Sequence, residues 1–274
     1  MNNREHFLEK TAQLDFAFQP IVDIETREIY AVEALLRNVE KLGYLSIHHF
    51  FDDAYSRGLL YTLDLLLREK AISKFAMLEN SRSLKLFYNL DNRLLEMDDY
   101  TTGNTDTILR RFNIDKSALC FEISERHEVR KECDIIHILE HYQREGFTLA
   151  IDDFGVGFSG FKLLYEFTPD VIKVDRFFLN GICEDPKKRL IVENIIAIAG
   201  ELGVRIIAEG IERESELEVC KALGCQFVQG YLIQRPTTDL NEIKISRPVP
   251  NNVALAAGSF QERGFAGENR KNLR

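Results

Sequence analysis

The chain has 274 residues, of which 45% are hydrophobic and 29% are charged, and its formal net charge is −9. This length fits either one large α/β barrel or two smaller domains. The acidic balance argues against general nucleic-acid binding, which requires a basic face. Because no apolar run has the length of a membrane span or the pattern of a secretory signal, we expect no membrane insertion by this chain itself and a cytoplasmic location. The sequence leaves open that the chain is a module of a longer protein.

The five cysteines are scattered through the chain, at Cys120, Cys133, Cys183, Cys220 and Cys225. Their number is odd and none belongs to a CxxC pair. This usage predicts reduced thiols rather than a disulfide framework.

The N-terminal part predicts an arm, two strands and a helical region. Residues 1–14 are expected to form a short polar helix or an arm. Residues 15–24 and 29–36 have the composition of strands, and the turn between them is too short for a crossover, so the two strands should pair antiparallel. Pro20 favours an edge or a break in the first strand. The leucine spacing within residues 47–78 predicts a long helix.

From residue 84 onward, predicted strands alternate with predicted helices. The strands are expected at 84–90, 119–123, 147–151, 171–174, 205–208 and 226–228. With the first two strands this makes eight, and the alternation predicts a modified (β/α)8 TIM-type barrel with an antiparallel strand near the N-terminus. A doubly wound open sheet is the alternative, but no glycine-rich fingerprint follows the first strand. We expect the barrel domain to cover residues 15–246 and a polar, poorly ordered tail to cover residues 247–274.

Two adjacent carboxylates, Asp152 and Asp153, stand between an apolar strand and a glycine-rich loop. Burying two such charges unpaired would be costly, and a hard divalent cation removes that cost. Taken alone, the pattern also fits a turn that merely closes a strand, since Asp and Gly are ordinary turn residues.

Six consecutive predicted strands carry a polar residue at or near the C-terminal end, where barrel enzymes have their active sites. These residues are Asn89, Glu122, Asp152 with Asp153, Lys173, Glu209 and Gln229. A lone glutamate within a strand, such as Glu33, usually faces solvent, but Glu33 can join this set.

The ligand types in this set favour Mg²⁺ or Mn²⁺ over Zn²⁺, because they are carboxylate and amide oxygens without His or Cys. Five carboxylates exceed the needs of one Mg²⁺, so two cations about 4 Å apart are expected. The residues thus predict metal-dependent hydrolysis of a phosphate ester. An enolase-like barrel with a lysine base is the alternative.

At these residues the chain resembles the EAL family of cyclic di-GMP phosphodiesterases. The motifs stand in the family's order as EALLR (33–37), YNL (88–90), FEISE (121–125), IDDFGVGFSG (151–160), IKVD (172–175), AEGIE (208–212) and QGY (229–231). The resemblance implies a phosphodiesterase that hydrolyses cyclic di-GMP to linear pGpG, and a homodimer. A non-catalytic cyclic di-GMP receptor and a degenerate, protein-binding EAL domain are the alternatives. Such members typically lack a carboxylate, the asparagine or the lysine, whereas the set here is complete.

The resemblance also implies roles for individual residues. One cation would be held by Glu33, Asn89, Glu122 and Asp152, and Asp152 would bridge to a second cation held by Asp153 and Glu209. The catalytic candidates are Lys173, Glu209 and Glu33. The substrate-binding candidates are Leu35, Arg37 and Gln229. Glu212 is expected to support the site, and Glu125 to anchor the glycine loop together with Ser159.

Overall fold

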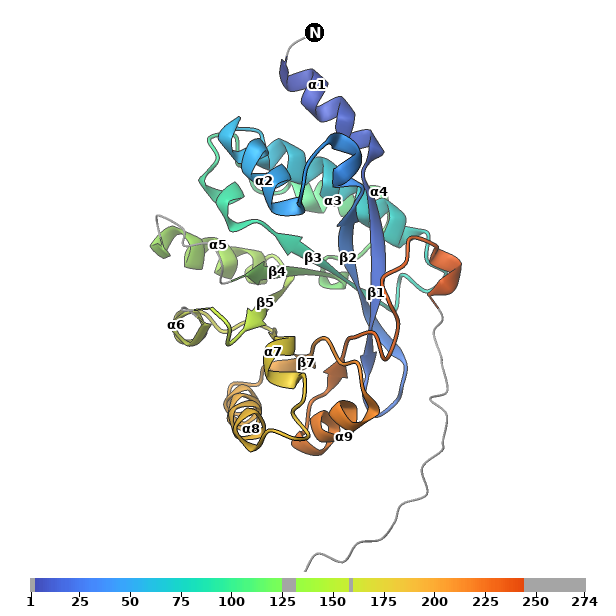
Figure 1. Cartoon of the computed structure of the whole chain (residues 1–274). Coiled ribbons are helices and arrows are strands. Elements are labelled where there is room, and N and C mark those ends of the chain that lie inside the picture. The colour runs from blue at the N-terminus through green and yellow to red at the C-terminus, as the bar shows by residue number, and fades with distance from the viewer. Residues whose placement is uncertain (1–2, 125–131, 158–159, 244–274) are drawn as a thin grey trace, which may run out of the picture.

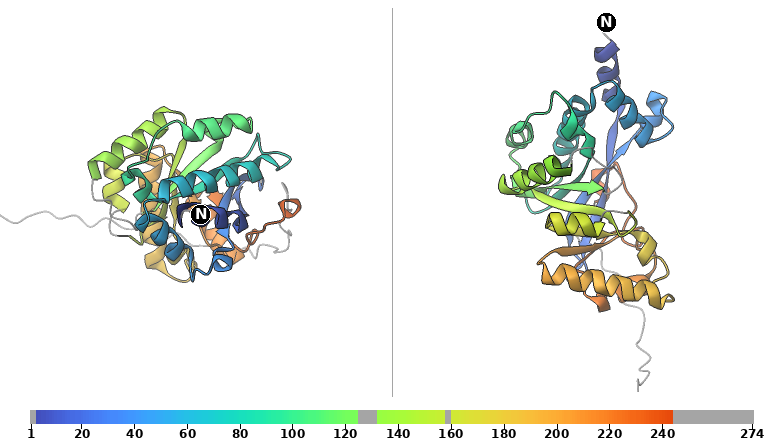
Figure 2. Two further views of the ribbon diagram at one scale, coloured as in Figure 1. Left: turned by 90° about the horizontal axis from the view of Figure 1, so that it is seen from above. Right: turned by 90° about the vertical axis from the view of Figure 1, so that its left-hand side faces the viewer.

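The structure is a computed structural model that describes residues 3–124, 132–157 and 160–243. Eight strands close a barrel in sequence order, and the helices lie outside the strands (Figure 1; Figure 2, left). The strands are β1 (Asp15–Asp23), β2 (Ile29–Arg37), β3 (Lys85–Leu90), β4 (Leu119–Ser124), β5 (Thr148–Phe154), β6 (Val171–Val174), β7 (Arg205–Ala208) and β8 (Phe227–Val228). The predicted modified (β/α)8 barrel is confirmed.

The α-helices assigned within these ranges follow the predicted alternation. They are α1 (Asn3–Lys10), α2 (Ile47–Ser56), α3 (Leu60–Ala76), α4 (Asn104–Arg111), α5 (Glu132–Arg144), α6 (Gly160–Glu166), α7 (Arg176–Leu179), α8 (Pro186–Glu201) and α9 (Glu214–Leu223). The helix expected near the N-terminus is α1. The proposed tail, residues 247–274, lies outside the described residues, so the domain boundaries stay predictions.

Strand β1 runs antiparallel to both of its neighbours, β2 and β8, and every other neighbouring pair is parallel. Pro20 lies in the middle of β1, opposite Val32 of β2. On the other side, β8 pairs only with the last two residues of β1. On the side of β1 away from β2, Phe18 exchanges two backbone hydrogen bonds with Thr237. Residues two apart in an antiparallel strand direct their backbone nitrogens to the same side, so the nitrogen of Pro20 also faces away from β2. The missing N–H therefore interrupts no ladder with β8.

The single helix expected over residues 47–78 is in fact two helices, α2 and α3. Gly58 adopts φ +65°, and the Leu59 N–H donates to the Ala54 carbonyl at 2.9 Å, which closes the end of α2. This is the arrangement in which a left-handed glycine terminates a helix. Both helices pack on the same core, α2 through Phe50 and Ala54 and α3 through its leucines.

A plug of apolar side chains, one from each strand, fills the barrel interior one layer below the C-terminal ends of the parallel strands. Its members are Ile21, Ala31, Phe87, Cys120, Ala150, Val171, Ile207 and Phe227. A larger apolar layer lies between the strands and the helices. Because side chains alternate along a strand, the residue two positions from a plug residue also faces the interior, one layer away. The plug therefore determines which residues line the mouth of the barrel.

None of the helices in the described ranges is long and apolar enough to cross a bilayer. The cysteines whose side chains are described, Cys120, Cys183, Cys220 and Cys225, are free thiols. Cys133 falls where side chains are not described.

Candidate active site

Directly above the plug, the barrel carries a ring of polar side chains, one from or just after each strand. Seven of them stand two residues beyond a plug residue: Glu33, Asn89, Glu122, Asp152, Lys173, Glu209 and Gln229. The eighth is Gln19, two residues before Ile21, because β1 runs in the opposite direction. Glu33 is only 6% exposed, so the expectation that a lone strand glutamate faces solvent is wrong here.

Lys173 is fully buried at the centre of this ring. Its Nζ lies 2.7 Å from Glu209 Oε1, 3.0 Å from Asp152 Oδ1 and 3.4 Å from Glu33 Oε2, and it also contacts Glu122 Oε1. Burial alone would lower the pKa of Lys173, but the four carboxylates outweigh burial and raise that pKa well above its ordinary value. The surrounding carboxylates therefore favour the charged form of Lys173.

The ring holds more acid than one lysine neutralises. Burial raises the pKa of Glu122 well above its ordinary value, and repulsion from Glu33 raises it further. Burial likewise raises the pKa of Glu209, although Lys173 opposes that shift. Added positive charge would relieve this repulsion, so the donor set fits a hard divalent cation.

Two amide side chains complete the ring. Asn89 Nδ2 donates to Glu33 Oε1 at 3.0 Å and to Glu122 Oε2 at 2.9 Å. Gln229 Nε2 donates to Glu33 Oε2 at 2.7 Å. The Asn89 amide thus lies between two candidate metal ligands, and turning it about its last bond presents Oδ1 to the same space.

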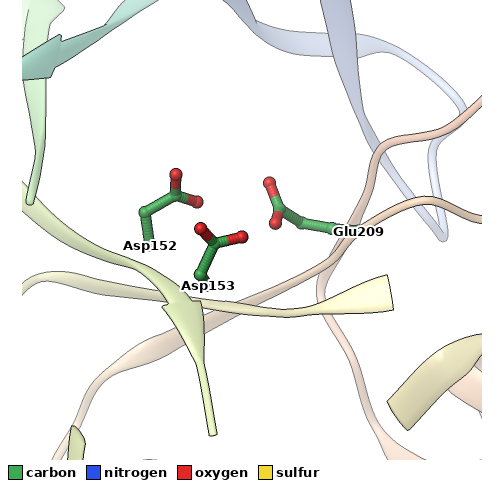
Figure 3. A group of neighbouring side chains, drawn as sticks. All are labelled: Asp152, Asp153 and Glu209. Atoms are coloured by element: carbon green, nitrogen blue, oxygen red, sulfur yellow. The ribbon is translucent and has the colours of Figure 1, made fainter. Parts of the chain in front are cut away.

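Asp152 and Asp153 both face the mouth because β5 is irregular at this point. The register between β5 and β6 shifts between Ile151 and Phe154, and Asp153 adopts a left-handed conformation with φ +53°. A β-bulge of this kind re-aims side chains that would otherwise face opposite sides. One carboxylate oxygen from each of Asp152, Asp153 and Glu209 lies within 4.8 Å of the others (Figure 3). These three residues form the second candidate metal group.

A cavity of about 370 Å³ opens beside the ring, and its wall includes Glu33, Leu35, Asn89, Asp152 and Asp153. Leu35 and Arg37 stand two and four residues beyond Glu33, so they lie on the same face of β2. Arg37 is half-buried, and burial lowers its pKa. Its Nη1 donates to the Leu36 carbonyl at 2.9 Å.

Glu212 lies outside the ring, in the loop that follows β7. Its Oε1 is 3.5 Å from Arg176 Nη2, and both side chains are exposed. Its backbone N–H donates to Glu216 Oε2 at 3.1 Å. The two residues expected to anchor the glycine loop, Glu125 and Ser159, lie outside the described residues.

Sequence reasoning missed Gln19, which belongs to the ring. The other seven residues lie at or just after the C-terminal ends of strands, whereas β1 runs antiparallel to its neighbours and meets the mouth with its N-terminal half. The signal was available: in an antiparallel strand, the polar residue precedes the inward apolar residue instead of following it.

This fold and ring define a (β/α)8 barrel with a carboxylate-lined mouth suited to hard cations. The profile of the EAL domain matches residues 2–236, and the chain belongs to the EAL domain family.

Curated relatives carry the family's activity in their names. Cyclic di-GMP phosphodiesterase PA2567 of Pseudomonas aeruginosa is 30% identical over 221 residues, which cover 80% of this chain and 38% of that protein. Probable cyclic di-GMP phosphodiesterase PdeI of Escherichia coli is 34% identical over 239 residues, which cover 85% of this chain and 30% of that protein. The chain thus spans less than two fifths of the length of either relative.

Solved structures of similar chains contain the nucleotide. BlrP1 of Klebsiella pneumoniae, solved as a manganese and cyclic di-GMP complex at pH 6, has a TM-score of 0.73 and 28% identity, with coverage of 82% of this chain and 56% of that one. A standalone EAL protein of Vibrio cholerae in its cyclic di-GMP-bound form has a TM-score of 0.69 and 29% identity, with coverage of 82% and 92%.

Proposed function

We propose that this chain hydrolyses cyclic di-GMP to linear pGpG with the aid of two divalent cations, Mg²⁺ or Mn²⁺. The observation that carries the proposal is the complete ring, in which Lys173 is surrounded by four carboxylates. The named relatives support the substrate, and the manganese complex of BlrP1 supports the metal.

The ring offers two neighbouring sets of oxygen ligands. Glu33, Asn89, Glu122 and Asp152 would hold one cation, and Asp152, Asp153 and Glu209 would hold the other. When bound, such a pair supplies a nucleophilic water at neutral pH and neutralises charge on the phosphoryl oxygens.

Lys173 and Glu209 would handle the attacking water. An ammonium group has three N–H donors, and three carboxylate oxygens lie at 3.0 Å or less from Lys173 Nζ. If Asp152 served as a ligand of a cation, one of these donors of Lys173 would be left to orient a water. Glu209, whose Oε1 lies 2.7 Å from Lys173 Nζ, is the candidate general base, because a carboxylate within hydrogen-bond reach of the water can accept its proton.

The substrate would lie in the cavity next to Leu35. Arg37 would bind a phosphate, because its planar fork matches phosphate oxygens. Leu35 offers an apolar contact to the nucleotide at the cavity wall.

A homodimer would use the surface of α6, α7 and α8, which lie next to one another (Figure 1; Figure 2, right). Large apolar side chains are exposed there: Phe161 (57%) and Tyr165 (90%) on α6, Phe177 (61%) on α7, and Leu190 (59%) on α8. Exposed apolar clusters of this kind mark interaction surfaces. Sedimentation of the wild type and of Tyr165→Lys tests this: the proposal requires a dimer that the substitution weakens, and a monomeric wild type refutes it.

The hydrolysis is tested by following cyclic di-GMP over time by anion-exchange chromatography, with Mn²⁺ and with excess EDTA. We expect pGpG with Mn²⁺, none with EDTA and none with Glu33→Gln. Glu218→Gln on the exposed face of α9 removes a carboxylate far from the ring and should retain full activity. If the nucleotide binds but survives, the protein is a receptor and the proposal is wrong.

A further inference from the structure

We propose that Gln19 is a positioning residue that fixes the amide of Gln229, so that Gln229 Oε1 accepts a hydrogen bond from a water in the mouth of the barrel. The inference rests on the proposed function and adds to it a residue that no motif of the sequence includes.

The orientation of both amides follows from one backbone carbonyl. The Gln234 carbonyl can only accept a hydrogen bond, and Gln19 Nε2 lies 3.0 Å from it. Gln19 must therefore turn its NH₂ group toward Gln234 and its Oε1 toward Gln229. Gln229 Nε2 donates to that oxygen at 3.2 Å.

Glu33 reinforces this orientation. The same Gln229 Nε2 donates its second proton to Glu33 Oε2 at 2.7 Å. Reversing the Gln229 amide would place its carbonyl oxygen against two acceptors, one of them a carboxylate, and both N–H bonds would be lost. A buried polar group left unpaired costs about 1–3 kcal/mol, so the reversed state is disfavoured as long as Gln19 is present.

With both N–H groups engaged, Oε1 is the atom that Gln229 offers to the site. Gln229 is only 4% exposed, and its Oε1 is buried without a hydrogen-bond partner among the described residues. An amide oxygen can only accept. It repels a phosphate oxygen, which excludes the direct phosphate contact that a substrate-binding role for Gln229 would suggest. The partner that this oxygen lacks is a hydrogen-bond donor, and water is the donor that the mouth of a barrel provides.

The location of the amide links this water to the reaction. Glu33 Oε2, which accepts from Gln229, is also 3.4 Å from Lys173 Nζ. The water held by Gln229 Oε1 therefore lies beside the ring of candidate ligands. Gln19 donates to the Gln234 carbonyl and accepts from Gln229, so it acts on the candidate ligands only through Gln229.

The test compares Gln19→Met, Gln229→Met and the double variant. Methionine keeps the side-chain length and removes the amide. We expect each single variant to lower kcat at least tenfold and the double variant to be no worse than Gln229→Met, because residues that act through one another are not additive. The dissociation constant for cyclic di-GMP, measured without turnover in Ca²⁺, should change less than threefold. Independent, additive losses in kcat, or a loss of nucleotide affinity at unchanged kcat, would overturn the proposal.

Two further variants separate this role from general damage. Gln143→Met removes another amide-to-carbonyl bond of 3.0 Å, from Gln143 Nε2 to the Thr168 carbonyl on the outside of the barrel, and should leave kcat unchanged. Gln19→Glu retains an acceptor toward Gln229, and burial opposite Glu33 favours its protonated form. That form also donates to the Gln234 carbonyl, so Gln19→Glu should keep more of kcat than Gln19→Met. It also serves if Gln19→Met fails to fold. A Gln19→Glu variant that is as slow as Gln229→Met would contradict the orienting role.

A measurement without turnover distinguishes failure of this inference from failure of the proposed function. The side-chain NH₂ signals of Gln229, assigned by their loss in Gln229→Met, should exchange slowly with solvent in the wild type and faster in Gln19→Met. If the wild type hydrolyses nothing, the proposed function fails while these signals still decide the orientation. If the signals exchange equally fast in both proteins, Gln19 does not position Gln229.

Discussion

Asp152 and Asp153 are consecutive residues whose carboxylates point into the same space, toward Glu209 (Figure 3). In a regular strand they would face opposite sides of the sheet. The register shift in β5 and the left-handed conformation of Asp153 remove that alternation. Aspartate tolerates this conformation better than most residues. The bulge therefore gives one strand end two candidate metal ligands.

This geometry predicts that Asp153→Asn weakens metal binding without damaging the fold, because asparagine also tolerates a positive φ. A ligand at 100 times its dissociation constant stabilises a protein by about 2.7 kcal/mol. A tenfold loss of affinity should remove about 1.4 kcal/mol of that gain. The measurement is the rise in melting temperature as Mn²⁺ is added. Asp98→Asn, an exposed carboxylate outside the ring, is the control, and an equal rise in Asp153→Asn and the wild type would contradict the assignment.

The ring was largely predictable because parallel strands all present their C-terminal ends at one mouth. Asn89, Glu122 and Lys173 stand near the C-terminal ends of their strands, and Glu209 directly follows β7. The common direction of these parallel strands alone brings the four side chains together. Gln19 escaped this rule because β1 is antiparallel.

Other features depended on contacts that one segment of sequence does not contain. The bulge at Asp152 is a mismatch between β5 and β6, and neither strand shows it alone. The break at Gly58 was visible only as a single glycine, which a continuous helix also tolerates. The four-residue helix α7 is too short for periodicity to reveal.

Gly210, which directly follows Glu209, should not tolerate a side chain. It adopts φ +65°, and a Cβ there would lie 2.5 Å from Arg176 Cβ. Gly210→Ala must shift either Arg176 or the loop that carries Glu209, so we expect a loss of stability of about 2–4 kcal/mol and a drop in kcat of at least tenfold.

Gly203→Ala is the matched control, because Gly203 adopts a similar φ of +72° with nothing within 4 Å of an added Cβ. Gly203→Ala carries only the cost of holding a residue with a Cβ in the left-handed conformation, about 1–2 kcal/mol. The measurements are the free energy of unfolding in urea and kcat, compared between Gly210→Ala and Gly203→Ala. Equal effects of the two substitutions would show that the contact with Arg176 is irrelevant.

Glu216 should make the protein sensitive to acid. Its buried carboxylate accepts from the backbone N–H groups of Gly181, Glu212 and Arg213 and from Arg213 Nε, at 2.9–3.1 Å. Burial alone would raise the pKa of Glu216, but these donors outweigh burial and hold the pKa below its ordinary value. A lowered folded-state pKa means that the stabilisation is fully present above the unfolded pKa of about 4.3 and is lost as pH falls through the folded pKa.

Glu216→Gln should therefore be less stable than the wild type at pH 7, by about 1.5–3 kcal/mol. This difference in the free energy of unfolding should disappear as the pH is lowered below about 4. Urea unfolding across this range measures it. Glu214→Gln, on the exposed side of the same helical turn, should show no such gap, and a gap for Glu216→Gln that persists in acid would refute the linkage.

The buried ion pair between Asp64 and Arg68 should be costly to break and tolerable to replace. Both side chains are 1% exposed, and they are in contact within α3. The Tyr88 hydroxyl donates to Asp64 Oδ1 at 3.1 Å, which ties α3 to β3 beside Asn89. Asp64→Asn leaves Arg68 charged and buried, so we expect a loss of about 3–5 kcal/mol.

The double variant Asp64→Leu/Arg68→Met removes both charges and should recover most of that loss, because an apolar pair of similar volume avoids the desolvation of two ions. The comparison is Asp106→Asn, since Asp106 and Arg110 form a pair with the same spacing at 2.8 Å on the surface. An exposed pair of this type contributes only about 0.3–0.5 kcal/mol. Urea unfolding of all three variants ranks them. If Asp64→Asn costs no more than Asp106→Asn, Arg68 finds other partners when Asp64 is neutral, and α3 is not held to β3 by this pair.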